Sequence, residues 1–190
     1  MKILIAGSPS KIFHLKELQD NLILLGVETK LVIDTEIYEG FPSRNLKKWF
    51  QTKGEFNKLM DNFKPNAILI DRQNTLFDVA VVQTKIPVFV LLRGDYWSEI
   101  KWAKETIYKG IIMKTIIKIK EKRAKKCFQD STMILPICNY LKNIVRNNYP
   151  EKSSKVLYQG IDPSKWYSEE GMELKHPCVG LLQGAVIWGK

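Results

Sequence analysis

Cysteine and histidine are scarce in this chain of 190 residues, which contains three cysteines and two histidines. The cysteines, Cys127, Cys138 and Cys178, lie far apart and form no C-x-x-C pair, so the sequence indicates neither a disulfide framework nor a zinc site. The two histidines, His14 and His176, are too few for a histidine-rich metal centre. We therefore expect reduced, structural thiols and no metal site.

Long hydrophobic runs are absent as well. No stretch approaches the roughly 18 uncharged apolar residues of a membrane span, and the apolar run at residues 3–6 is too short for a signal peptide. We therefore expect a cytoplasmic protein. Internal repeats and low-complexity segments are also missing, and a content of 45% hydrophobic and 26% charged residues is typical of one domain with a sizeable core.

Acidic residues are few relative to basic ones: 20 Asp and Glu stand against 30 Lys and Arg, which gives a net charge of +10. Most of this excess lies in residues 101–126, which contain ten basic residues and two acidic ones. On a helix, the isoleucines of this segment fall mainly on one face, and the other face carries Lys114, Lys118, Lys122 and Lys126. An anionic partner is therefore expected.

This basic segment favours a helix that rests on an anionic membrane surface, because aromatic residues that suit the headgroup level accompany it, namely Tyr96, Trp97, Trp102 and Tyr108. The alternative is a solvated basic face whose isoleucines pack on a sheet, as in any amphipathic crossover helix. Nucleic acid is a third possible partner. It is disfavoured because the aromatics are not set on strands as stacking platforms and no recognised binding motif is present.

Short apolar runs alternate with helical patterns along most of the chain. We expect strands at residues 3–6, 27–34, 67–70, 88–92, 133–135 and 155–158. The expected helices are 12–25, 46–63, 75–83, 98–128 and 139–148. Continuously apolar strands joined by helices are typical of a parallel sheet covered on both faces. The sequence therefore predicts an α/β fold with a doubly wound, Rossmann-like parallel sheet.

The alternation of short apolar runs and helical patterns stops near the end of the sequence. Residues 162–175 are polar and rich in turn formers, and residues 179–182 then read as a fresh strand with no helix after it. A parallel strand needs a crossover partner. We therefore expect residues 1–175 to form the Rossmann-like domain, and residues 176–190 to be a linker and the first strand of a second domain that this chain does not contain.

Candidate site residues follow the strands, because open parallel sheets bind ligands at their carboxyl ends. Gly7 and Ser8 precede a helix N-terminus and are phosphate-site candidates, although a tight turn also explains the glycine. Arg93 and Asp95 place a cation and a carboxylate beside Gly94, where they would hold an anionic substrate and orient or deprotonate a hydroxyl. For Arg93 with Asp95, and likewise for Asp71 with Arg72, the alternative is an ordinary surface ion pair.

Two nucleotide motifs are incomplete. Residues 184–190 match the first seven positions of a P-loop after a strand, but the sequence stops before the Ser or Thr that would bind Mg²⁺, so no nucleotide hydrolysis follows from it. The glycine fingerprint of dinucleotide-binding folds is missing as well. A dinucleotide-dependent oxidoreductase is therefore disfavoured, with Asp34 after the second expected strand as its only support.

Three segments together resemble the interdomain signature of glycosyltransferase family 4. They read ILPICNYL at residues 134–141, KVLYQGIDPSKW at 155–166, and VGLLQG at 179–184 followed by Lys190. The most specific piece is Gly160-Ile161-Asp162 with Trp166 four residues later. Departures from the usual pattern include Cys138, Gln159 and Ala185.

This resemblance covers the whole chain and implies the N-terminal, acceptor-side half of a two-domain GT-B enzyme. The implied activity is transfer of a sugar, with retention, from a nucleotide-sugar donor such as a UDP- or GDP-sugar to a glycan or lipid-linked acceptor. No metal or other cofactor is implied. The fragment alone is expected to be inactive, because half a cleft cannot preorganise the transition state.

The resemblance also implies roles for individual residues. Arg93, which stands where many members carry a histidine, and Asp95 would be catalytic; Gly7, Ser8, Gly184 and Lys190 would bind the donor. The acceptor would be held by Ser10, Lys11, Arg72, Tyr96 and Asn139. The basic helix would place the enzyme peripherally on the inner face of the cell membrane. The alternative hypothesis is a non-catalytic Rossmann-like module that binds nucleic acid or an acidic partner through that helix.

Overall fold

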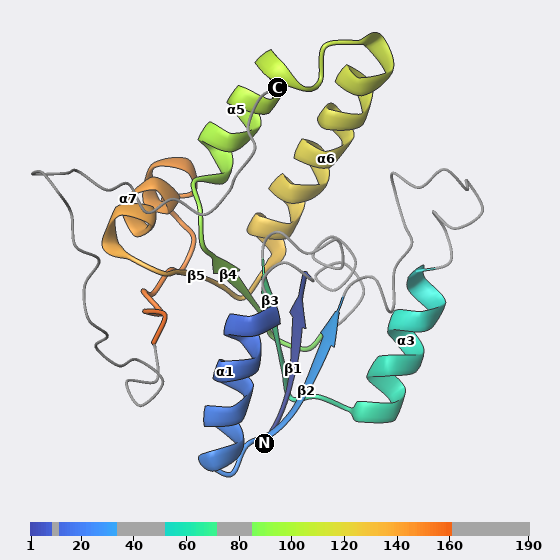
Figure 1. Cartoon of the computed structure of the whole chain (residues 1–190), viewed down its shortest axis with the longest axis vertical. Helices are drawn as coiled ribbons and strands as arrows, with labels where there is room; N and C mark the ends of the chain where they lie inside the picture. The colour runs from blue at the N-terminus through green and yellow to red at the C-terminus, as the bar shows by residue number, and fades with distance from the viewer. Residues whose placement is uncertain (9–11, 34–51, 72–84, 161–190) are drawn as a thin grey trace, which may run out of the picture. The chain divides into compact units, whose positions relative to one another are not determined.

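The computed structural model describes residues 1–8, 12–33, 52–71 and 85–160 of the chain (Figure 1). Its centre is a five-stranded sheet in the order β2-β1-β3-β4-β5, and every neighbouring pair is parallel. The strands are β1 (Lys2–Gly7), β2 (Glu28–Ile33), β3 (Ala67–Asp71), β4 (Val88–Leu92) and β5 (Met133–Pro136). This confirms the predicted Rossmann-like parallel sheet.

Five helices belong to the described residues: α1 (Ile12–Leu24), α3 (Thr52–Phe63), α5 (Tyr96–Thr106), α6 (Ile111–Asp130) and α7 (Asn139–Asn148). One face of the sheet buries Ile5, Leu69 and Leu91 against Leu15 of α1. On the opposite face, the strands pack against α3, α5, α6 and α7 in a larger cluster. Helices therefore cover both faces, as a parallel sheet buried on both sides requires.

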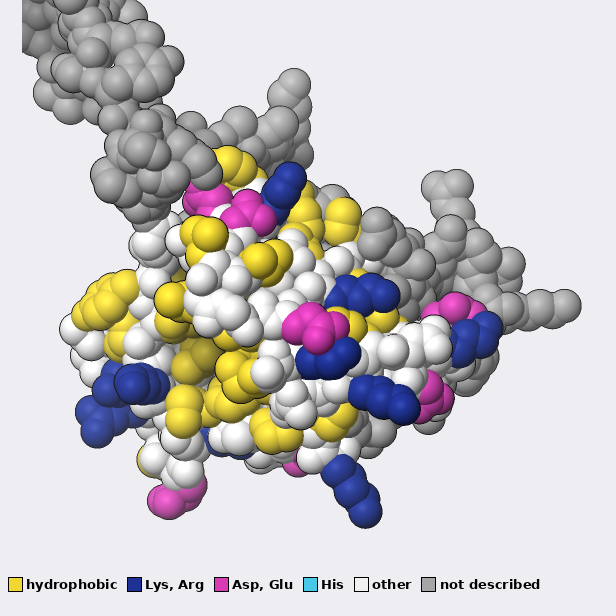
Figure 2. All heavy atoms as spheres, turned by 90° about the horizontal axis from the view of Figure 1, so that it is seen from below, with side chains coloured by type: hydrophobic (Ala, Val, Ile, Leu, Met, Phe, Trp, Pro, Cys, Tyr) yellow, Lys and Arg dark blue, Asp and Glu magenta, His cyan; other side chains and the backbone are white. Residues whose placement is uncertain are grey.

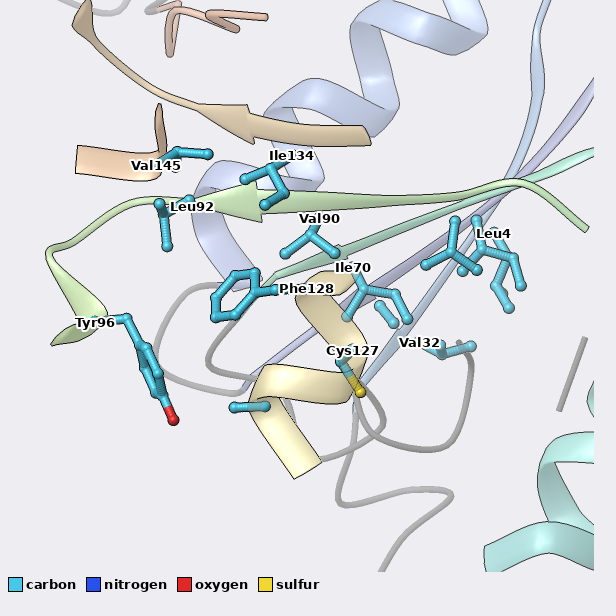
Figure 3. Packing of buried hydrophobic residues seen from close by; sticks show 14 of the residues in the cluster. Leu4, Val32, Ile70, Val90, Leu92, Tyr96, Cys127, Phe128, Ile134 and Val145 are labelled. Carbon is cyan, nitrogen blue, oxygen red and sulfur yellow. The ribbon is translucent and has the colours of Figure 1, made fainter. Parts of the chain in front are cut away.

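The larger cluster is built from alternate residues of the strands. Figure 3 shows Phe128 and Cys127 of α6 beneath Ile70, Val90 and Leu92 of the neighbouring strands β3 and β4. Because successive strand residues point to opposite faces, the apolar runs supply both clusters at once. Burying side chains of this size contributes about 1.5–3 kcal/mol each, which makes this layer the main source of stability.

Gly26 ends α1 in the way the sequence indicates. Its φ of +76° lies in the left-handed region that glycine adopts without strain. Its amide donates to the Ile23 carbonyl at 2.9 Å, and the amide of Val27 donates to the Leu22 carbonyl at 3.0 Å. These two bonds form a Schellman motif, which satisfies carbonyl groups that the helix itself leaves open.

The single helix predicted over residues 98–128 is wrong. The structure has two helices there, α5 and α6, separated by a turn at residues 107–110. The amides of Ile107 and Tyr108 both donate to the carbonyl of Ala103, at 2.8 and 2.9 Å, which closes α5. Gly110 then adopts an extended conformation as the N-cap of α6. Glycine is a poor helix former, and that was the signal for the break.

The prediction of a strand at residues 155–158 is also wrong, because the structure has no regular strand there. Residues 153–157 run along β5 with only one isolated parallel bridge, between Ile134 and Ser154. Three backbone hydrogen bonds join this segment to β5, including one of 2.9 Å from the Leu157 amide to the Pro136 carbonyl. Pro136 has no amide to donate in return, which limits the ladder.

Other expectations fall on residues that the structure does not describe. These are the first part of the helix at 46–63, the helix at 75–83 and the strand at 179–182. The described residues up to Gly160 belong to one compact unit, Met1–Gly160. The predicted domain boundary at residue 175 lies outside the described part of the chain, so it stays a prediction.

Candidate functional site

The carboxyl ends of β1, β3 and β4 lie side by side at one edge of the sheet. Ala6 of β1 pairs with Ile70 of β3, and Asp71 at the end of β3 pairs with Leu91 of β4. The chain leaves β1 toward β2 on one side and later returns to β3 on the other. Such a reversal of strand order is where open α/β sheets bind their ligands.

A buried ion pair joins two of these strand ends. Nη2 of Arg93 lies 2.5 Å from Oδ2 of Asp71, and the two side chains are only 9% and 1% exposed. A buried charge requires a partner of opposite sign, and here each ion supplies it for the other. The guanidinium is therefore held in place at the edge where a ligand is expected.

Arg93 keeps further hydrogen-bonding capacity. Its Nε and Nη1 atoms are buried and have no hydrogen-bond partner among the described residues. Leaving such donors unsatisfied costs about 1–3 kcal/mol or more for a charged group. Ligand oxygen atoms would remove that cost by accepting from these atoms, as carboxylate and phosphate oxygens commonly do from arginine.

This pairing was not predicted. The sequence suggested pairs between neighbours, Arg93 with Asp95 and Asp71 with Arg72, whereas the structure joins Asp71 to Arg93 across 22 residues. The signal was present in part, because both residues follow apolar strands. Only the strand order, which places β3 beside β4, shows that the two strand ends meet.

Gly7 is explained by packing on α1. A Cβ atom at this position would lie 2.1 Å from Cδ1 of Leu15, a distance that no real side chain tolerates. Ser8 follows it and is buried. The predicted donor-phosphate role of Gly7 and Ser8 stays a prediction, and Ser10 and Lys11 lie outside the described residues.

Asp95 caps the helix α5. Its Oδ1 accepts hydrogen bonds from the amides of Trp97 and Ser98 at 3.1 and 3.2 Å, and its Oδ2 accepts one from the Ser98 hydroxyl at 2.5 Å. No hydrogen bond or ion pair within the described residues joins it to Arg93. The structure thus brings Arg93 and Asp71 together, and it engages Asp95 at the helix N-terminus. The catalytic role of Asp95 stays a prediction.

The predicted acceptor residues lie in different surroundings. Tyr96 is buried, with its ring 5.5 Å from that of Phe128, so its body belongs to the core. Asn139 is exposed at the start of α7, and its Nδ2 donates to the Tyr158 hydroxyl at 3.3 Å. Arg72, Gly184 and Lys190 lie outside the described residues. The acceptor roles therefore remain predictions.

The predicted membrane-surface lysines are all exposed on α6. Lys114, Lys118 and Lys122 are exposed, whereas the buried residues of the helix are Ile117, Ala124, Cys127 and Phe128. Lys126 pairs with Asp130 at 2.6 Å, and this hydrogen bond raises the pKa of the Lys126 ammonium. The interaction occurs on a fully exposed surface, where it contributes little to stability.

The aromatic residues beside the basic segment do not all lie at a surface. The ring of Trp97 stacks on Phe128 with 5.4 Å between centroids, and Tyr96 lies edge-on to the same ring. The interpretation of Tyr96 and Trp97 as headgroup-level aromatics is therefore wrong. Both anchor the start of α5 to the core, because the amphipathic pattern of α5 is used for packing.

A shallow hollow of about 520 Å³ lies at the opposite end of the strands, where their amino ends meet. Its lining includes Asp61, Lys64 and Lys85, which precede β3 and β4 or belong to α3. Figure 2 views the molecule from this side, where Lys and Arg side chains are interspersed with acidic and hydrophobic ones. The mixed charges favour no single ligand class there, so the carboxyl edge remains the candidate site.

A metal-binding cluster and a membrane-spanning helix are both absent from the described residues. These residues contain no group of three or more His, Cys, Asp and Glu side chains that could hold a metal ion. Among them, no helix is both long enough and apolar enough to cross a membrane.

Comparison with known proteins identifies no family. No family model matches the sequence, and no curated protein matches it. Among solved structures, the chain is similar to UGT73P12 of Glycyrrhiza uralensis complexed with glycyrrhetinic acid 3-O-monoglucuronide, with 15% sequence identity and a TM-score of 0.43. The match covers 82% of this chain and 42% of the other, so this chain spans less than half the length of that protein. A similarity of this size carries no functional assignment.

Proposed function

We propose that this chain is the acceptor-side half of a retaining glycosyltransferase, which moves a sugar from a UDP- or GDP-sugar to a glycan or lipid-linked acceptor. The sequence resemblance to glycosyltransferase family 4 suggests the reaction class. The observation that supports a ligand at the carboxyl edge is the guanidinium of Arg93, which is fixed by Asp71 and has two donor atoms without partners among the described residues.

The chemistry of sugar transfer suits such a group. In the proposed reaction, the bond between the anomeric carbon and the donor phosphate breaks, and the acceptor oxygen bonds to the same face of the sugar. The acceptor proton passes to the departing phosphate oxygen, on which negative charge develops. A guanidinium that is already fixed in position stabilises developing negative charge without a cost of reorganisation.

The proposal divides the reaction between two domains. Arg93 and its neighbours would hold the acceptor and face the phosphate, and the donor would be bound mainly by a second domain. Gly184 and Lys190 would belong to that second binding surface. A cleft closed from both sides positions the two substrates, which is a large part of the rate enhancement in bimolecular reactions.

The test uses the protein that carries this chain together with its donor domain, and Arg93→Lys as the variant. Lysine keeps the charge beside Asp71 but lacks the Nε and Nη1 donors. We expect kcat/KM for sugar transfer to fall about 100-fold, as after the loss of one transition-state donor, while the melting temperature stays near that of the parent. Lys16→Ala, an exposed change on α1, is the control.

Two results would contradict the proposal. If no donor from a panel of UDP- and GDP-sugars is consumed with glycan or lipid acceptors, the reaction class is wrong. If transfer occurs and Arg93→Lys leaves kcat/KM unchanged, the assigned role of Arg93 is wrong. The anomeric configuration of the product, measured by NMR, separately tests retention.

A further inference from the structure

The turn between α5 and α6 exposes a group of large apolar side chains. Ile107, Ile111, Ile112 and Met113 are 52%, 86%, 76% and 37% exposed, within seven consecutive residues. A single exposed apolar residue is ordinary on a protein surface, but a contiguous group commonly marks an interaction site. We define the hairpin tip as residues 107–114.

The tip lies away from the body of the described unit. α5 leaves the carboxyl end of β4, α6 returns to β5, and the turn between them lies beyond the carboxyl edge of the sheet (Figure 1). The buried residues of the two helices are Tyr96, Ala103, Ile117, Ala124, Cys127 and Phe128, none of which belongs to the tip. The core therefore uses the lower part of the hairpin and leaves the tip uncovered.

Positive charge surrounds these apolar residues. Lys109, Lys114 and Lys118 are exposed, and none of them forms an ion pair within the described residues. Lys104 is neutralised by Glu121 at 2.5 Å. The exposed Glu105 is the acidic residue beside the tip. The hairpin tip thus combines exposed apolar side chains with neighbouring lysines that form no ion pair within the described residues.

We propose that the hairpin tip inserts Ile111 and Ile112 into an anionic membrane surface, with Lys109, Lys114 and Lys118 on the lipid headgroups. Acyl chains accept the isoleucines, and phosphate groups accept the ammonium groups, so a lipid surface satisfies both features. Nucleic acid or an acidic peptide would account for the lysines alone. The exposed isoleucines therefore decide in favour of lipid.

This arrangement differs from the helix lying flat on the membrane that the sequence suggested. A flat helix would offer its whole apolar face to lipid, but Ile117, Ala124 and Phe128 of that face are buried in the protein. The exposed large apolar residues of α6 and the preceding loop are Ile107, Ile111, Ile112 and Met113 of the tip, together with Ile119. Docking by the tip would turn the carboxyl edge of the sheet, and with it Asp71 and Arg93, toward the membrane. The proposal does not depend on the sugar-transfer activity.

The experiment is co-sedimentation of the full 190-residue chain with vesicles. One set contains equal amounts of phosphatidylglycerol and phosphatidylcholine, and the other contains phosphatidylcholine only. We expect binding to the anionic set and little to the neutral set. Ile111→Ser with Ile112→Ser should weaken binding at least about tenfold, because two side chains lose their apolar transfer.

The chain provides a matched control for the apolar change. Leu24 and Leu25 are 84% and 79% exposed at the end of α1, so Leu24→Ser with Leu25→Ser removes similar apolar surface at another place. This control should bind like the parent. If the two double variants bind equally well, insertion of the tip is disproved.

Charge reversal tests the second half of the proposal. Lys114→Glu with Lys118→Glu should weaken binding about 30-fold or more, since each lysine near an anionic surface contributes about a factor of five. The control, Lys16→Glu with Lys155→Glu, changes the net charge equally at two other exposed positions. If both charge variants lose binding equally, net charge rather than the tip attracts the lipid, and the proposal is wrong.

A parallel titration with duplex DNA separates the remaining alternative. Tighter binding to DNA than to anionic vesicles, unaffected by Ile111→Ser with Ile112→Ser, would overturn the proposal in favour of a nucleic-acid partner. Since none of these measurements involves sugar transfer, their outcome is independent of the activity proposed above.

Discussion

The two ends of α6 place the same type of residue in opposite environments. Ile111 and Ile112 in its first turn are exposed, whereas Ile117 is 2% exposed and Phe128 near the end is fully buried. With 3.6 residues per turn, Ile111 and Ile112 lie on a different side of α6 from Ile117 and Phe128. The difference teaches that the isoleucines of one helix need not share a face, and that the neighbouring elements decide which of them become core.

The largest effect is expected at the base of the hairpin. Phe128→Ala should lower the free energy of unfolding by about 4 kcal/mol, because it removes a buried ring and leaves a cavity. The tip variant Ile112→Ala should change it by no more than about 0.5 kcal/mol. Urea unfolding of both variants measures the contrast. Equal losses would show that the tip is also packed in the folded protein.

A second large effect is expected for the buried ion pair between Asp71 and Arg93. Arg93→Met should lower the free energy of unfolding by about 3 kcal/mol, because it removes the guanidinium that balances the buried charge of Asp71. The double variant Asp71→Leu with Arg93→Met should recover much of this loss, since apolar side chains then replace both members of the ion pair. Unfolding of the four proteins completes a double-mutant cycle. Additive losses in the cycle would mean that the pair does not interact.

A moderate effect is expected where α5 begins. Asp95→Ala should cost about 1 kcal/mol, because the amides of Trp97 and Ser98 lose the carboxylate that caps them. Asp95→Asn keeps an acceptor and should retain most of the stability. Thermal unfolding compares the two variants. If the asparagine variant is as unstable as the alanine one, the charge of Asp95 rather than its capping hydrogen bonds is what matters.

The smallest effect is expected where α6 begins. Gly110 is the N-cap of α6 and makes no side-chain capping bond, and a Cβ atom there would meet nothing within 4 Å. Gly110→Ser should therefore stabilise the helix by a few tenths of a kcal/mol. Slower hydrogen exchange of the amides at 112–114 is the readout. Faster exchange would indicate that the turn before α6 needs the freedom of glycine.

Local sequence signals predicted much of the fold. The bounds of β4 and α7 are those expected from their apolar runs and flanking residues, and Gly26 ends α1 as anticipated. The break between α5 and α6 was missed, because the helical period continues on both sides of Gly110. Hydrogen bonds from Ile107 and Tyr108 to Ala103 close α5 there, and periodicity does not report them.

The site was predicted less completely. The sequence placed Arg93 correctly after a strand, since it follows an apolar run, whereas Gly7, expected after the first strand, is the last residue of β1. It did not indicate that the carboxylate of Asp95 caps α5, and the catalytic role of Asp95 stays a prediction. It also missed Asp71 as the partner of Arg93, because residues 22 positions apart become neighbours only when β3 pairs with β4.

By itself, the sequence determined where the strands and most helices form and that the strands run parallel, because hydrophobic period and turn residues act over a few neighbouring positions. The tertiary structure decided which strand ends meet and which apolar residues stay uncovered. Both depend on the order of strands and on which helix lies over which face. The pairing of Asp71 with Arg93 and the exposure of Ile111 and Ile112 are the two consequences on which the proposed activity and the proposed membrane contact depend.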